Sequence, residues 1–163
     1  MKRTIKLTVL TLALTFVSVA AFAQSATTTN AANNISATVV KNCLITNFAL
    51  AFGNYDPTAA AATDASTTFD VRCTKGTVTS IQLDLGVNDG GTGVRKMTDG
   101  TDLLSYGLFT DAARTVAWTV AAPKAYTAAS NAPVTQTIYG RVTAGQDVPV
   151  GSYFDTVQAT INF

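Results

Sequence analysis

Residue types that commonly perform catalysis are sparse in this chain of 163 residues. It has no histidine, so neither a Ser-His nor a Cys-His couple can form, and no imidazole is offered to a catalytic metal. Two aspartate pairs are close enough in sequence to act together: Asp99 with Asp102, and Asp84 with Asp89. Such spacing is equally typical of solvated aspartates in turns. We therefore expect no catalytic residues and no enzyme activity.

The glycine-rich segment NDGGTG, at 88–93, has little resemblance to a known binding loop. Asp89 lacks the following carboxylates that a calcium loop needs. The segment also lacks the lysine and the helix of a phosphate-binding loop. We interpret it as a turn, and we expect no metal site, no cofactor and no small-molecule substrate.

The N-terminus predicts export from the cytoplasm. The first six residues, MKRTIK, carry three positive charges and precede an apolar stretch over 7–21. The triplet AFA at 21–23 then matches the small-x-small pattern that signal peptidases cleave. A membrane anchor is the alternative, but the apolar run is shorter than the roughly 20 residues of a span and no charged stop follows it. We expect residues 1–23 to be a signal peptide, with cleavage before Gln24.

Export gives the two cysteines, Cys43 and Cys73, a natural interpretation as one disulfide. In the chain-entropy model, the loop that this bond closes corresponds to a stabilisation of the folded state by about 3–4 kcal/mol. A metal site is the alternative, but two cysteines without histidine are too few soft ligands for a structural zinc.

The charge balance excludes two classes of partner. Three of the eleven basic residues lie in the expected signal peptide, which leaves eight against ten aspartates. The sequence has no basic patch that would predict binding of nucleic acid, and it has no run of charges that would predict binding to a membrane surface.

The remaining chain, which is one domain in length, predicts an all-β protein. It contains no glutamate and is rich in threonine, valine, alanine and glycine. Segments in which apolar and polar residues alternate predict six to eight short strands. They lie at 35–43, 48–52, 67–73, 78–86, 94–100, 103–111, 134–143 and 153–163. We expect a β-sandwich, with 67–73 and 78–86 forming a hairpin and the alanine-rich 58–66 forming a loop or a short helix.

Both ends of the predicted domain, 35–163, are unusual. Residues 24–34, QSATTTNAANN, are small, polar and of low complexity, and would be disordered alone; a frayed terminus is the simpler interpretation. At the other end, Val157, Ala159, Ile161 and Phe163 alternate with polar residues up to the last position. They predict a strand with one buried face and an exposed outer edge, which invites the addition of another strand.

Several segments resemble one family in order along nearly the whole exported chain. They are Cys43, FGNYDP at 52–57, DVRCTKG at 70–76, RKM at 95–97, LSYGLFTDAARTVAW at 104–118, IYGRV at 138–142 and GSYFDTVQATINF at 151–163. The chain resembles the spore coat protein U domain, the pilin module of archaic chaperone–usher pili.

The resemblance implies an immunoglobulin-like β-sandwich that lacks its seventh strand. A periplasmic chaperone would fill the gap in transit, and the N-terminal extension of another copy or a related pilin would fill it in the fibre. The implied acceptor residues are Val157, Ala159, Ile161 and Phe163. The implied donor residues are Ala26, Thr28, Ala31, Ala32 and Ile35. Ala37 and Val39 continue the donor pattern, but they also fit the first predicted strand.

The resemblance further implies secretion across an outer-membrane usher to a cell-surface fimbria that supports adhesion and biofilm formation. One alternative is a secreted coat or matrix protein with the same domain. Another is an adhesive module that binds carbohydrate through exposed aromatics such as Trp118 or Tyr126. A tip adhesin would need a further receptor domain, for which this length leaves no room.

Overall fold

A computed structural model describes residues 31–163 of the chain. The chain divides into two units, Met1–Ala37 and Thr38–Phe163. Residues 31–37 of the first unit are exposed and belong to no strand. The expected signal peptide and the donor candidates Ala26 and Thr28 lie outside the described residues. Within 31–163 there is no helix long and apolar enough to cross a membrane.

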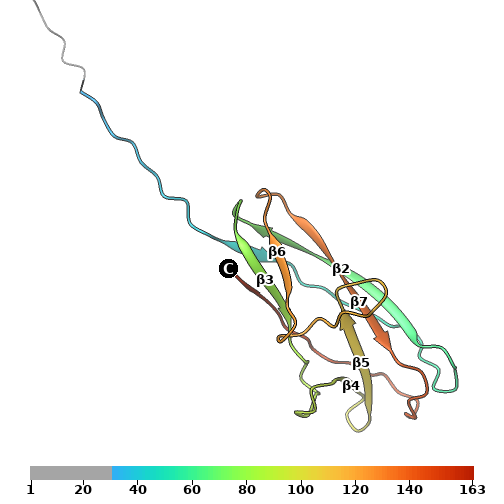
Figure 1. Cartoon of the computed structure of the whole chain (residues 1–163). Helices are drawn as coiled ribbons and strands as arrows, with labels where there is room; N and C mark the ends of the chain where they lie inside the picture. Colours follow the sequence, from blue (N-terminus) through green and yellow to red (C-terminus); the bar gives the residue numbers. More distant parts are fainter. Residues whose placement is uncertain (1–30) are drawn as a thin grey trace, which may run out of the picture. The chain divides into compact units, whose positions relative to one another are not determined.

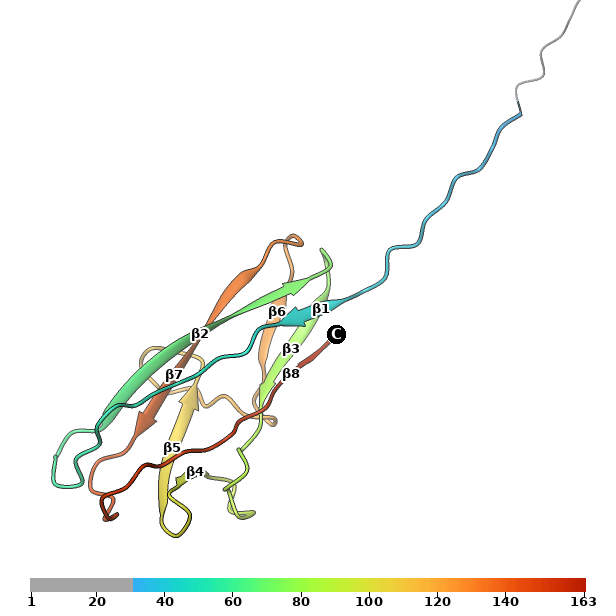
Figure 2. The same cartoon turned by 180° about the vertical axis from the view of Figure 1, so that it is seen from behind.

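The second unit is an all-β sandwich of two antiparallel sheets, as predicted (Figures 1 and 2). The larger sheet has the order β1-β2-β7-β5-β4, and the smaller one has the order β6-β3-β8. The strands are β1 (Cys43–Ile45), β2 (Thr63–Cys73), β3 (Val78–Leu83), β4 (Arg95–Thr98), β5 (Leu103–Phe109), β6 (Lys124–Thr127), β7 (Val134–Val142) and β8 (Ala159–Asn162).

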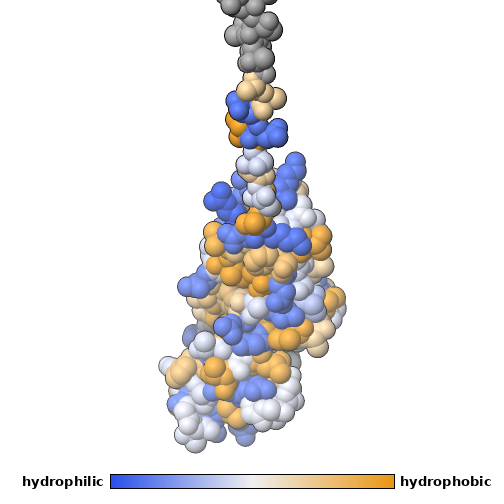
Figure 3. Space-filling model, turned by 90° about the vertical axis from the view of Figure 1, so that its left-hand side faces the viewer, coloured by the Kyte–Doolittle hydropathy of each residue, from blue (hydrophilic) through white to orange (hydrophobic). Residues whose placement is uncertain are grey.

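Large apolar side chains also reach the surface of this unit. One side of it carries apolar residues that adjoin hydrophilic ones (Figure 3). The exposed apolar residues of the whole unit include Val39, Val40, Leu44, Val150 and Phe154. Single exposed apolar residues are ordinary in soluble proteins, so only their grouping can carry meaning.

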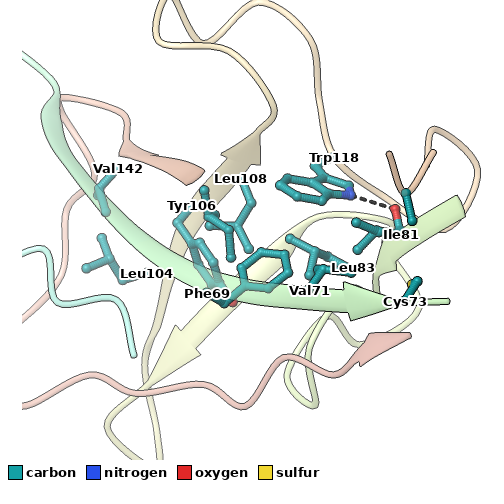
Figure 4. Close-up of a cluster of buried hydrophobic side chains, with 12 residues drawn as sticks. Phe69, Val71, Cys73, Ile81, Leu83, Leu104, Tyr106, Leu108, Trp118 and Val142 are labelled. Carbon is teal, nitrogen blue, oxygen red and sulfur yellow. Dashed lines mark hydrogen bonds between the residues drawn. The ribbon is translucent and has the colours of Figure 1, made fainter. Parts of the chain in front are cut away.

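The core lies between the two sheets and follows from the period-two patterns. Alternate residues of β2, β3, β5 and β7 point inward, and twelve buried apolar residues form one cluster. Trp118 is fully buried in it, where its indole nitrogen donates a hydrogen bond of 2.8 Å to the carbonyl of Ile81 (Figure 4). A buried indole needs such a partner, so Trp118 ties its loop to β3.

Several predictions about individual segments are wrong. Residues 48–52 belong to no strand, and only Ala159–Asn162 of the predicted strand 153–163 form one. Strands β2 and β3 do not form a hairpin, because β2 pairs with β1 and β7 while β3 pairs with β6 and β8. The turn between them passes from one sheet to the other, with Thr77 buried at the corner. The alanine-rich loop is shorter than predicted, since β2 already begins at Thr63. The first strand begins at Cys43, and 35–42 belong to no strand.

The predicted disulfide is confirmed. Cys43 and Cys73 are direct partners in the register of β1 and β2, and their sulfurs are bonded at 2.05 Å. Because β1 has only three residues, this bond fastens the beginning of the domain to the long strand β2.

Replacing both Cys43 and Cys73 with serine should lower the free energy of unfolding by about 3–4 kcal/mol, because the unfolded chain regains the entropy of the open loop. Urea unfolding followed by Trp118 fluorescence measures this. The oxidised and reduced wild-type proteins provide the control. An unchanged midpoint would show that the bond contributes nothing to stability.

Candidate functional site

An open groove crosses the domain between two extended segments. Residues 46–55, which follow β1, form one wall, and residues 153–158, which lead into β8, form the other (Figure 2). The groove has a volume of about 380 Å³ and is floored by Met97, Tyr106 and Leu108. No strand of the described chain lies between the two walls.

The first wall presents aromatic and aliphatic side chains to the core. Phe48, Leu50 and Phe52 are partly buried against the core cluster, while the alanines between them are exposed. Gly140 of β7 makes room for this wall. A Cβ at that position would come within 2.6 Å of a Leu50 methyl and 2.8 Å of the Phe52 ring. The first wall is therefore held in place by side-chain packing. Its apolar and exposed residues alternate as in a strand, but residues 48–52 pair with no strand.

Hydrogen bonds fix the end of the first wall. The hydroxyl of Tyr55 donates to the carbonyl of Thr143 at 3.1 Å and accepts from the amide of Gln146 at 2.8 Å. The side chain of Gln146 in turn pairs with both backbone groups of Ser105, at 2.8 and 2.9 Å. These contacts attach the wall to β5 and to the loop after β7.

The second wall uses only one of its two backbone edges. The amide and carbonyl of Phe154 both bond to Thr98 at 3.0 Å, and the carbonyl of Gln158 accepts from Asp84 at 3.0 Å. Successive backbone groups of an extended chain point in opposite directions. In the described structure the backbone groups of Asp155 and Val157 bond no partner and face the groove. This edge can therefore accept a further strand.

Asp155 anchors the second wall to the floor. Its carboxylate accepts hydrogen bonds from the hydroxyl of Tyr106 at 2.7 Å, the amide of Val87 at 3.0 Å and the side chain of Asn88 at 2.9 Å. Gly86 has a φ of +77°, and a Cβ there would overlap the same carboxylate. Only glycine suits this position, because both its conformation and its neighbour exclude a side chain.

Burial, followed by the hydrogen bond to Asp155, raises the pKa of the Tyr106 phenol. The phenol is therefore a protonated donor at neutral pH. Nearby, the guanidinium of Arg95 is buried and donates to three carbonyls, those of Asp84, Leu83 and Trp118. Burial lowers the pKa of Arg95, but these carbonyls satisfy its donors, so it holds the core together and offers nothing to a ligand.

The model of the Spore Coat Protein U domain matches residues 27–160. "Protein U" of Myxococcus xanthus is 35% identical over 164 residues, which cover 90% of this chain and 92% of that protein. The chain belongs to the spore coat protein U domain family.

Among the solved structures similar to this family member, one has a TM-score above 0.5 and shows the same fold. It is the chaperone–tip adhesion subunit pre-assembly complex of archaic chaperone-usher Csu pili from Acinetobacter baumannii, with a TM-score of 0.54 and 19% identity. The match covers 77% of this chain and 40% of that one. A chaperone–tip adhesin complex of CFA/I fimbriae is more distant, with a TM-score of 0.46, 16% identity, and coverage of 74% and 42%. The chain thus spans about two fifths of the solved chains it matches.

The residues predicted as the acceptor strand of this family member lie along the second wall and β8. Val157, Ala159 and Ile161 are partly buried against the core, whereas Phe163 is half exposed. Ala31, Ala32 and Ile35, predicted as donors, are exposed. The sequence pattern did not reveal that a second wall opposes this strand, although Phe48, Leu50 and Phe52 were visible as an alternating segment.

The aspartate pairs have structural roles. Asp99 accepts hydrogen bonds from the amides of Asp102 and Thr101, at 2.8 and 3.0 Å, and these bonds lower its pKa. Asp84 accepts from the amides of Gly86 and Gln158. Within residues 31–163 no group of three acidic, cysteine or histidine side chains could hold a metal ion.

Replacing Tyr106 with phenylalanine should cost about 2 kcal/mol of stability at pH 7, because Asp155 loses a hydrogen bond from a buried donor. The difference should shrink above about pH 10, where the unfolded wild-type chain releases its phenolic protons while folded Tyr106 retains its own. Urea unfolding at pH 7 and pH 11 compares the two proteins. A difference that is the same at both pH values would contradict the raised pKa.

Proposed function

We propose that this chain is a structural subunit of cell-surface pili, built by inserting the N-terminal segment of one copy into the groove of another. The observation that carries the proposal is the second wall. Its backbone edge toward the groove has no hydrogen-bond partner, and a row of partly buried apolar side chains lies beside this edge. The proposal is supported by the fold, which the chain shares with a subunit of archaic chaperone-usher pili.

The groove is suited to bind an extended strand. A strand placed between the walls would pair with the free backbone groups around Asp155 and Val157. Its inward side chains would cover Phe48, Leu50 and Val157. Main-chain hydrogen bonds and apolar pockets for alternate side chains are the two features of recognition by strand addition.

Residues 24–37 of a second copy supply a suitable donor. The groove is already lined by the large rings of Phe52 and Tyr106, so small donor residues such as Ala31 and Ala32 fit the space that remains. Residues 35–42 belong to no strand of their own domain, which leaves Ile35, Ala37 and Val39 free to extend the donor.

The same proposal accounts for the route to the surface. The signal peptide, 1–23, directs the chain to the periplasm, where a chaperone covers the groove. An outer-membrane usher then exchanges that chaperone for the next subunit, either a copy of this chain or a related pilin. The solved relative from Csu pili, a chaperone bound to a tip subunit, supports the chaperone as a partner. Adhesion and biofilm formation are the expected roles of the fibre.

The alternative functions are less well supported. Carbohydrate binding would need an exposed aromatic platform, but Trp118 is fully buried and Tyr126 is partly buried in the core. A coat or matrix protein would use the same domain without a chaperone or an usher, and it would leave the shape of the groove unexplained.

Replacing Val157 with aspartate should abolish polymers, because the new charge lies in the groove and would be buried by an inserted strand. Replacing Thr160 with aspartate is the matched control, since Thr160 lies in the same segment with its side chain exposed. Purified exported chains are run unheated on a denaturing gel, and near-ultraviolet circular dichroism from Trp118 checks folding. A ladder of oligomers from folded Val157→Asp protein would contradict the proposal.

A further inference from the structure

The two ends of the sandwich carry opposite charge. The basic end is where β1 begins, where the β2–β3 and β6–β7 turns lie and where β8 finishes (Figures 1 and 2). Lys41, Arg72 and Lys75 are found there and are exposed. Asp70, which lies further along β2, accepts a hydrogen bond from Thr135.

The acidic end is formed by the loops at the other end of the same strands. It holds half of the aspartates in the chain and one lysine, Lys96. The aspartates are Asp56, Asp89, Asp99, Asp102 and Asp147. Hydrogen bonds from neighbouring groups lower the pKa values of Asp56 and Asp99, so these two remain ionised at neutral pH.

The two ends also differ in surface shape. The basic end has a shallow hollow of about 560 Å³ lined by Leu44, Arg72 and Lys75 among others. The acidic end presents protruding apolar side chains, with Val150 fully exposed and Phe154 exposed by 66%. Each end therefore offers apolar surface beside charge, and the charges are of opposite sign.

The path of a donor strand decides which ends can meet. The second wall and β8 together run from the acidic end to the C-terminus at the basic end (Figure 2). A donor that runs antiparallel to this wall leaves the groove at the acidic end, and its own domain then begins with its basic end. A parallel donor would bring two basic ends together. The link from Ile35 to Cys43 spans at most about 29 Å, so the ends that meet must lie close to each other.

We propose that the acidic end of one copy binds the basic end of the next copy, with Val150 and Phe154 of the first facing the hollow around Leu44 of the second. This contact, which rests on the proposed function, selects the antiparallel donor. It also accelerates assembly, because complementary charges steer the encounter of two copies. The steering weakens as salt shortens the screening length from about 30 Å at 0.01 M to about 8 Å at 0.15 M.

Charge reversal at each end tests the contact. One variant carries Lys41→Glu and Lys75→Glu, a second carries Asp89→Lys and Asp147→Lys, and a third carries all four. In the described structure none of these four side chains makes a hydrogen bond or an ion pair, so the fold should be unaffected. Polymer growth of the exported chain is followed by light scattering at about 0.01 M and about 0.15 M salt.

At low salt each single-end variant should assemble roughly tenfold more slowly than the wild type, and the variant with all four changes should regain the wild-type rate. Equal rates for all four proteins would overturn the contact while the pilus role stands. Failure of the four changes to restore the rate would overturn the charge pairing. Absence of polymer from the wild type at either salt concentration would instead overturn the proposed function.

Discussion

The unpaired backbone edge along residues 153–158 is the constraint on which the rest of the molecule depends. An amide or carbonyl without a partner is costly once it is removed from water, and an apolar row beside it favours that removal. The described domain cannot both remove these backbone groups from water and give them partners, because the other edge of the second wall already bonds Thr98 of β4 and Asp84. A strand from outside does both at once. In the proposed function, the domain keeps its groove open until the donor strand of another copy fills it.

The features that hold the groove open are distributed around it. Gly140 lets the first wall approach β7, and Tyr55 fixes the end of that wall. On the opposite side, Asp155 joins the second wall to Tyr106. None of these contacts uses the backbone edge that faces the groove. Rigid walls reduce the entropy that an incoming strand must lose, which is the general advantage of a preorganised site.

Part of this architecture was predictable from the sequence. The alternation in 134–143 and in 153–163 predicted strands with one buried face, and the two cysteines predicted the bond between β1 and β2. The partners of β2 and β3 could not be inferred in the same way, because period two says which face of a strand is buried but not which strand lies beside it. The wall at Phe48, Leu50 and Phe52 was interpreted as a strand for the same reason. Its alternation comes from packing on Gly140, which only the tertiary structure reveals.

If the N-terminal segment of another copy fills the groove, polymers can form only from chains that carry this segment. The most direct measurement compares the exported chain, which begins at Gln24, with a chain that begins at Thr38, where the second unit starts. Both are purified and run unheated on a denaturing gel. A ladder of oligomers from the longer chain and a single monomer band from the shorter one is the predicted result. A monomer band from both chains, or a ladder from both, would contradict donor-strand assembly.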